Sequence, residues 1–264
     1  MLHSSTTTRS LPASLAPIVA ALELRQPKVV TSGLLAEIAQ EAGSNLAPAA
    51  IAERLVRRGW LLPLRVRDAW EFAPGAHAGR FGWGDAWIEL RALLAHSPDA
   101  PVAVAFESAI WELGHTTHQP TKPVLAHRHG WQAPPGVSAR SVTYEWRLHP
   151  AKLKDLPVWQ AATAVVAAAD RPGAQGDWHN ANDWLPETFR ATTLDDVLTE
   201  VEGRGKASVA RLGYLAEWSH RFDIADALDE LLVGRRPVVY LGPRETKGRW
   251  ANRWRLYDSL LPER

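Results

Sequence analysis

The stretch from residue 29 to residue 72 constrains the fold more than any other part of the chain. Apolar residues recur at helical spacing in two short runs, which predict helices over residues 32–42 and 48–58. Between them lies the sequence GSN (residues 43–45), which is typical of a helix-ending turn, and Pro48 suits the first position of a helix. We therefore expect two helices joined by a tight turn.

A hairpin follows the second helix. Residues 60–64 and 69–72 are typical of two short strands, which residues 65–68 (RVRD) would connect. Five arginines and no acidic residue lie between Arg54 and Arg67, so positive charge falls on the second helix and on the hairpin. This order of elements, with the charge in these places, predicts a winged helix-turn-helix that binds double-stranded DNA.

A helix that enters the major groove needs small residues near its start and donors that reach bases and phosphates. Arginine suits the donor positions because its planar guanidinium can bind guanine or phosphate through two parallel hydrogen bonds. The alternative is a module that binds protein, with arginines that only complement the dipole of the helix. The residues that we expect to contact DNA are Lys28, Ser44, Asn45, Ala49, Ala50, Arg54, Arg57, Arg58, Arg65 and Arg67.

The composition limits how such binding can arise. The chain has 264 residues, of which 46% are hydrophobic, so it can bury a substantial core and most naturally forms two domains. Its formal net charge is +1, so any nucleic-acid binding must come from local basic patches. The chain has no cysteine, which excludes disulfides, thiol nucleophiles and cysteine-ligated zinc and fits a reducing cytoplasm.

The aromatic residues are unusually rich in tryptophan. Thirteen tryptophans accompany four tyrosines and five phenylalanines. Aromatic surfaces can stack on bases or sugars, but these tryptophans are scattered along the sequence rather than clustered. We therefore expect most of them to fill a core and a domain interface.

Pro74-Gly75 and three further glycines up to Gly84 mark a domain boundary near residue 80. We expect a winged helix domain over residues 1–80, whose first ten residues form a flexible tail, and a larger mixed α/β domain over residues 81–264. The fold class is therefore α+β. Beyond the boundary, the predicted helices are 85–95, 107–113, 158–169, 194–202 and 209–230, and the predicted strands are 102–106, 142–148 and 238–241.

The N-terminal region contains a short apolar run. Residues 15–22 could form the core of a signal peptide, but the residues before them are polar, and Glu23 and Arg25 follow at once. We expect a first amphipathic helix over residues 11–24 instead. Because no run approaches the roughly 18 apolar residues of a membrane span, we expect no membrane partner and a cytoplasmic location.

Three segments resemble a family of bacterial regulators. The segment ERLVRRGWL (residues 53–61), continued by AWEFAPG (residues 69–75), resembles the N-terminal winged helix of AbiE-type (AbiEi) antitoxins. The later FESAIWELGH (residues 106–115) looks like the family's Ser-Ala-Leu-containing helix near the start of its C-terminal domain. Several family members end the wing in a basic-Gly-Val-Tyr pattern, where this chain has RDAW (residues 67–70). Length and domain order also match, so the resemblance covers most of the chain.

The resemblance implies the antitoxin of a type IV toxin–antitoxin system. Such a protein represses its own operon by binding repeats in the promoter, and it neutralises a nucleotidyltransferase-like toxin, either by direct contact or by opposing its effect. The C-terminal domain would provide the antitoxin activity, and we expect no catalytic activity and no cofactor. The first rival is a nucleic-acid-processing enzyme with a site around Asp177, His179 and Asp183. The second is a protein-binding adaptor that uses the winged helix only as a scaffold.

Two polar clusters are candidates for other chemistry. Four histidines, His115, His118, His127 and His129, could in principle hold a metal, but there is no HExxH motif and no firm carboxylate ligand. We expect a surface or loop patch and no metal. The Asp177–Asp183 cluster brings carboxylates close to an imidazole, although the surrounding composition is more simply that of a loop anchored by tryptophans.

A second basic region lies near the end of the chain. The sequence from Gly234 to Arg255 contains seven basic residues and one acidic residue. It could bind DNA alongside the wing, bind an RNA, face an acidic toxin surface, or form a solvated rim around a strand. The residues that we expect to form this surface are Arg244, Lys247, Arg249 and Arg253.

Overall fold

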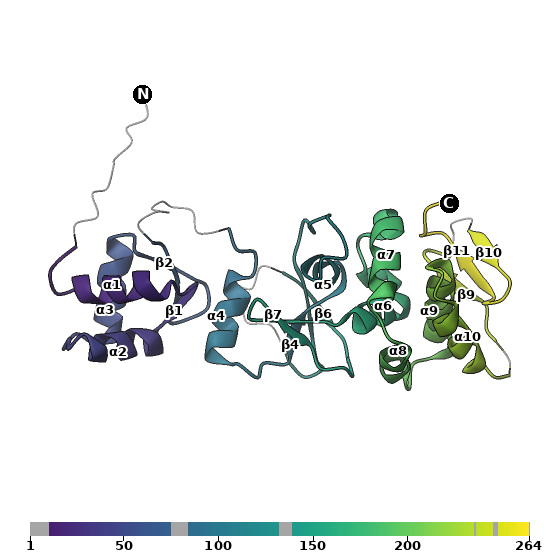
Figure 1. Ribbon diagram of the computed structural model, residues 1–264, viewed down its shortest axis with the longest axis horizontal. Coiled ribbons are helices and arrows are strands. Elements are labelled where there is room, and N and C mark those ends of the chain that lie inside the picture. The colour runs from purple at the N-terminus through teal and green to yellow at the C-terminus, as the bar shows by residue number, and fades with distance from the viewer. Residues whose placement is uncertain (1–10, 75–83, 132–138, 235, 245–247, 264) are drawn as a thin grey trace, which may run out of the picture. The chain divides into compact units, whose positions relative to one another are not determined.

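A computed structural model describes residues 11–74, 84–131, 139–234, 236–244 and 248–263 (Figure 1). The described part of the chain forms two compact units, the first ending at Ala100 and the second beginning at Pro101. The boundary predicted near residue 80 lies outside the described residues, and the first unit continues beyond it. The described residues form a mixed α/β protein with three small sheets.

The first unit alternates short helices with short strands. Three of its strands form one antiparallel sheet in the order β1-β3-β2. Its elements are α1 (Ala16–Arg25), β1 (Val29–Thr31), α2 (Ser32–Glu41), α3 (Pro48–Arg57), β2 (Leu61–Pro63), β3 (Ala69–Phe72) and α4 (Ile88–His96). The two predicted helices and the hairpin are therefore present, whereas the sequence did not predict β1.

The helices of the first unit bury the apolar stripes that the sequence places on them. Leu35 and Ile38 of α2 and Ile51 and Leu55 of α3 are fully buried in one core with residues of α1 and the sheet. The hydroxyl of Thr31 accepts a hydrogen bond from the backbone N–H of Leu34 at 3.2 Å, which caps the start of α2. Helix α3 is thus fixed along one side, which leaves its opposite side for other contacts.

The described part of the second unit contains two sheets and a group of helices. The larger sheet is mixed, with the order β6-β5-β4-β8-β7, and the smaller has the order β10-β11-β9. Its sheet elements and first helix are β4 (Val102–Val104), α5 (Phe106–Glu112), β5 (Val124–His127), β6 (Arg140–Thr143), β7 (Ala151–Leu153), β8 (Leu156–Val158), β9 (Val239–Leu241), β10 (Arg249–Ala251) and β11 (Leu256–Asp258). The remaining helices are α6 (Ala161–Asp170), α7 (Ala181–Arg190), α8 (Leu194–Val201), α9 (Lys206–Trp218) and α10 (Phe222–Glu230).

Helix α6 lies at the centre of the helices of the second unit. All residues from Ala161 to Ala169 are buried, and α6 packs against α5, α7, α8 and α9. Trp159, Trp184 and Trp254 are among the largest fully buried side chains. Three of the tryptophans therefore fill the core, as expected from their scattered positions.

The structure corrects several predicted elements. The helix predicted over residues 209–230 is two helices, because His220 adopts a left-handed conformation with φ of 61° between α9 and α10. The strand predicted over residues 142–148 ends at Thr143. The first helix begins at Ala16 rather than at residue 11. Among the described residues, no helix has the length and apolar character needed to cross a membrane.

Candidate nucleic-acid interface

Helix α3 presents a polar side away from the core of the first unit. Ala49, Glu53 and Arg57 are exposed, and Arg54 is half-buried beside them. Ala50, which we expected to contact a base, is also only half-exposed. The exposed side therefore has the small residue near its start and the basic residues further along that a helix in a major groove needs.

The three arginines of the predicted recognition helix differ in their surroundings. The guanidinium of Arg57 lies 2.8 Å from a carboxylate oxygen of Glu53, one helical turn earlier. Arg58 donates to the backbone carbonyl of Arg54 at 3.2 Å and so completes the end of the helix. For the guanidinium of Arg54, the structure shows no ion-pair partner among the described residues. Arg54 is thus the arginine of α3 that is most available to a phosphate.

The turn before α3 also bears two predicted contact residues. The hydroxyl of Ser44 accepts a hydrogen bond from the backbone N–H of Leu46 at 3.3 Å, and Asn45 is exposed. Gly43 has a φ of 62°, a conformation that residues with a Cβ rarely adopt, which explains the glycine at this turn. The turn therefore holds the Asn45 amide at the surface, close in sequence to the start of α3.

The hairpin formed by β2 and β3 bears Arg65 and Arg67 on its connection, and both are exposed. Arg67 lies 3.4 Å from the carboxylate of Asp68, whose φ is 54°. The two oxygens of the Glu89 carboxylate accept the backbone N–H groups of Arg65 and Val66 at 3.0 and 3.2 Å. Glu89 of α4 therefore fixes the hairpin connection, and sequence reasoning did not identify it because it lies far along the chain.

A hollow of about 410 Å³ separates α3 from the hairpin. Glu53 and Arg57 line it on the helix side, and Asp68 and Trp70 line it on the hairpin side, with Ser32 at the start of α2. The hollow thus contains two carboxylates and one guanidinium, so its floor is not basic. The other basic residues of these two elements, Arg54 on α3 and Arg65 and Arg67 on the hairpin connection, are not among the residues that line it.

Lys28 lies before β1 and is exposed, and its ammonium group is 3.6 Å from the carboxylate of Asp85. Burial alone would raise the pKa of Asp85, but hydrogen bonds from the Trp87 backbone and the Arg91 side chain outweigh this and leave it lowered. Asp85 is therefore ionised at neutral pH and partly neutralises Lys28.

The second basic region is largely engaged within the second unit. Arg249 lies 2.7 Å from the buried carboxylate of Asp258, and that hydrogen bond raises the pKa of Arg249. Arg253 lies 2.7 Å from Asp226 and 3.4 Å from Glu217. The hydrogen bond to Asp226 raises the pKa of Arg253. Lys247 lies outside the described residues. Arg244, the remaining residue predicted to form this surface, is exposed, and its guanidinium lies over the Tyr240 ring.

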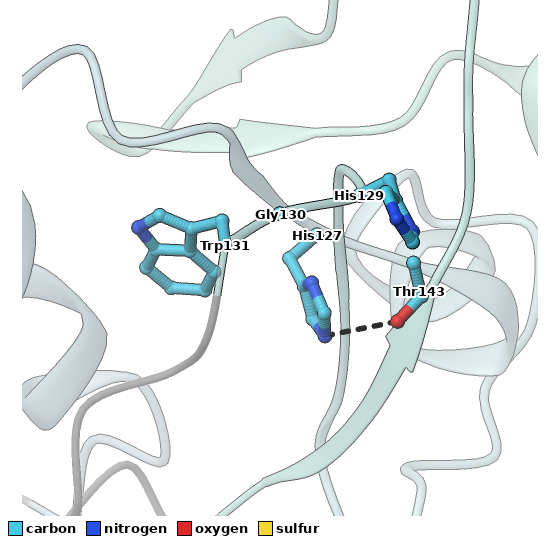
Figure 2. Close-up of a pocket in the computed structure, with 5 residues that line it drawn as sticks. All are labelled: His127, His129, Gly130, Trp131 and Thr143. Carbon is cyan, nitrogen blue, oxygen red and sulfur yellow. Dashed lines mark hydrogen bonds between the residues drawn. The ribbon is translucent and has the colours of Figure 1, made fainter.

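The four histidines divide into two pairs. His115 and His118 follow α5, and the imidazole of His118 lies 3.5 Å from Asp183. His127 and His129 line a pocket of about 520 Å³ with Trp131 and Thr143. His127 Nε2 lies 3.5 Å from the Thr143 hydroxyl oxygen, a contact that Figure 2 marks with a dashed line. Among the described residues, no three His, Asp or Glu side chains come together as a metal site.

Burial lowers the pKa of His115 below its ordinary value of 6.5, although the charge of Glu187 opposes this effect. The unfolded chain therefore binds this proton more readily than the folded chain, so the stability contributed by neutral His115 is lost as the pH falls below about 6.5.

We expect the free energy of unfolding to fall less in His115→Gln than in the parent protein when the pH is lowered from about 7.5 to about 5.5. Urea midpoints at both pH values measure this, with exposed His149→Gln as control, and equal losses in all three proteins would contradict it.

The candidate catalytic cluster is only partly assembled. The Asp177 carboxylate accepts a hydrogen bond from the Asn180 amide at 2.7 Å and lies 3.6 Å from His179 Nε2. Asp183 faces His118 instead, as its 3.5 Å contact indicates. An imidazole and a carboxylate are thus adjacent, but the second predicted carboxylate interacts with a different histidine.

Comparisons with known proteins find a similar fold among solved structures. No protein-family model matches the chain. No curated protein matches it either. Among solved structures, the crystal structure of the RV2827C protein from Mycobacterium tuberculosis superposes with a TM-score of 0.80 and 24% sequence identity, over 97% of this chain and 94% of that one. The chain therefore shares its fold with that mycobacterial protein.

Proposed function

We propose that this protein is a DNA-binding antitoxin and transcriptional autorepressor, and that its first unit is a winged helix-turn-helix. In this proposal α3 is the recognition helix, the β2–β3 hairpin is the wing, and the toxin is a nucleotidyltransferase-like protein of the same operon. The observation that carries the proposal is that α3 and the hairpin flank one hollow lined by Arg57, with Arg54 on the same helix and the exposed Arg65 and Arg67 on the hairpin connection.

The geometry supports contacts with double-stranded DNA in particular. An α-helix fits the major groove, and the side chains beside it can then reach the phosphates of both strands. Arg54 and the hairpin arginines supply these donors, and Ala49 permits close approach of the helix to the bases. The Glu89 carboxylate supports the proposal because it fixes the connection that bears Arg65.

The arginines are expected to contribute to binding through the release of counterions. With about four phosphate contacts, the logarithm of affinity should fall with the logarithm of salt at a slope near −4. Arg54→Ala should weaken binding to the DNA upstream of the gene and reduce the size of that slope by about 1. Glu53→Gln should act in the opposite direction, because it releases Arg57 from the ion pair at 2.8 Å.

Mobility-shift titrations of the full-length protein across a range of salt concentrations measure both effects. Arg190→Ala is the matched control, because Arg190 is exposed on α7 and pairs with a glutamate of its own helix, Glu187, as Arg57 does. We expect this control to leave affinity and slope unchanged. The absence of a specific shift, or Arg54→Ala and Glu53→Gln variants that bind as the parent does, would refute the recognition-helix proposal.

The antitoxin role has its own test. The full-length protein should restore growth when it is co-expressed with the nucleotidyltransferase-like protein encoded next to it. Arg54→Ala should still restore growth when both genes are expressed from an unrelated promoter, because α3 serves repression in this proposal. Failure of the parent protein to rescue growth would remove the antitoxin assignment and leave the DNA-binding assignment to be judged by the titrations.

A further inference from the structure

The sheet formed by β9, β10 and β11 bears a row of aromatic side chains. In the strand register, Trp250 of β10 lies opposite Tyr257 of β11, and Tyr257 lies beside Tyr240 of β9. The Trp250 and Tyr257 ring centroids are 4.7 Å apart, and the Tyr257 and Tyr240 rings stack at 5.6 Å with an angle of 22°. Each strand thus contributes one ring to a continuous row.

The aromatic row faces away from the core. The residues on either side of Tyr257 and Tyr240 in their strands are buried, so alternation directs these two rings to the opposite face of the sheet. Trp250 is 42% exposed and Tyr257 is 41% exposed. The buried face packs against α9, which Figure 1 shows beside the sheet. Two exposed rings in register, with the half-buried Tyr240 ring beside them, indicate a binding surface, because single exposed apolar residues are common but contiguous ones are not.

Positive charge accompanies the row. The guanidinium of Arg244 lies 5.3 Å from the centroid of the Tyr240 ring, within the range of a cation–π contact. Arg255 is exposed and directly precedes β11. Because β9 and β11 are parallel, Arg244 after the first and Arg255 before the second lie at opposite ends of the sheet. The face therefore offers the exposed Trp250 and Tyr257 rings in its middle and guanidinium groups toward both ends.

We propose that this aromatic row binds unpaired bases of single-stranded RNA. Aromatic side chains can stack only on bases whose faces are free, and a duplex keeps those faces within its own stack. RNA loops and ends present such bases, and a basic sheet surface with exposed rings is suited to them. This inference goes beyond the proposed function, because it concerns the second unit and a different nucleic acid.

The occupant follows from the combination of rings and guanidinium groups. Each base has a π-face, so the exposed Trp250 and Tyr257 rings, in register on adjacent strands, can accept successive bases without reading their sequence. The arginines at the two ends can bind the phosphates that connect those bases. Arg249 and Arg253 take no part in this, because carboxylates of the second unit already hold them at 2.7 Å.

Fluorescence anisotropy of a labelled oligouridylate of about twelve nucleotides tests the proposal with the full-length protein. We expect the Trp250→Ala/Tyr257→Ala double variant to bind at least about tenfold more weakly than the parent, since each base–ring stack contributes substantially to affinity. Phe222→Ala is the matched control, because Phe222 is an aromatic residue of α10 that is 52% exposed but lies outside the row. It should bind as the parent does.

Further arms separate this surface from α3 and from other occupants. Arg54→Ala should leave oligouridylate binding unchanged, and the double variant should leave duplex binding unchanged. No binding of oligouridylate by the parent, equal binding by the double variant, or tighter binding of an oligothymidylate of the same length would overturn the proposal. Loss of toxin neutralisation in the double variant with oligouridylate binding intact would assign the face to a protein and would also overturn it. Because both replaced side chains are partly exposed, the double variant should unfold at the same urea concentration as the parent.

Discussion

Replacement of Glu200 by leucine is expected to lower the free energy of unfolding of the second unit by about 3–5 kcal/mol. The Glu200 side chain is completely buried on α8. One of its oxygens accepts hydrogen bonds from the backbone N–H groups of Arg147 and Leu148 at 3.0 and 2.8 Å, and from the Thr163 hydroxyl at 2.7 Å. Leucine would leave three donors without an acceptor, one of them the buried Thr163 hydroxyl, and a buried donor in that state costs about 1–3 kcal/mol.

The contacts of Glu200 also explain why the effect should spread through the second unit. Arg147 and Leu148 belong to the connection between β6 and β7 of the larger sheet, and Thr163 belongs to α6 at the centre of the helices. Glu200 therefore links the sheet and the helices of one unit through a single oxygen atom. Its loss should weaken both parts together rather than loosen one loop.

Unfolding in urea, followed by tryptophan fluorescence, measures this loss. Glu200→Gln is the matched control, because its amide oxygen can still accept the same three hydrogen bonds, and it should lose much less stability than Glu200→Leu. Thr163→Val removes only one donor and should lose about 1 kcal/mol. If Glu200→Leu were as stable as Glu200→Gln, the three hydrogen bonds would not contribute as the structure indicates.

The sequence predicted the first unit well because its signals are local. The helical spacing around Leu35 and Ile51 and the turn at Gly43 depend on neighbouring residues, and the structure has α2, the turn and α3 where they were expected. Strand β1 was missed for the opposite reason. Its three residues form a strand because they pair with Ala69–Glu71 of β3, which lie far along the chain.

The same distinction applies to the predicted sites. Counting basic residues near the C-terminus identified Arg249 and Arg253, but a count does not reveal that Asp258 and Asp226 lie within 2.7 Å of them. The aromatic row was equally hidden, because it depends on the parallel pairing of β9 with β11. The alternation of buried and exposed residues around Tyr257 was the available signal, but three-residue strands are too short for alternation to be distinctive.

The two proposed surfaces would divide recognition between the units by the state of the bases. A helix and a hairpin with arginines suit a duplex, whose bases are accessible only at their edges. An exposed row of rings suits unpaired bases, whose faces are free. Each surface belongs to one unit and is made of that unit's own residues, so substitutions can test the two surfaces separately.

Gly213→Ala is expected to destabilise the second unit by about 2–3 kcal/mol, although alanine favours a helix over glycine by about 1 kcal/mol. Gly213 is buried in α9, and a Cβ atom there would lie 2.2 Å from two carbons of the Trp254 ring. The ring cannot yield easily, because it is almost fully buried and its Nε1 donates to a Glu217 carboxylate oxygen at 2.6 Å. Overpacking of this kind outweighs the gain in helix propensity.

The same substitution connects stability to the proposed RNA surface. Trp254 lies between β10 and β11, so a displaced ring should disturb the register of Trp250 and Tyr257 and weaken oligouridylate binding, with duplex binding by α3 unchanged. Urea unfolding measures the stability, and Gly33→Ala is the matched control, because the nearest atom to its new Cβ would be 3.7 Å away. We expect that control to be as stable as the parent or more so.

A double-mutant cycle tests the clash itself. Gly213→Ala should lower the free energy of unfolding less in a Trp254→Leu background than in the parent, because the smaller leucine side chain removes the clash. A Gly213→Ala protein as stable as Gly33→Ala would show that the indole moves aside at little cost, and the close contact of α9 with Trp254 would then not fix the sheet.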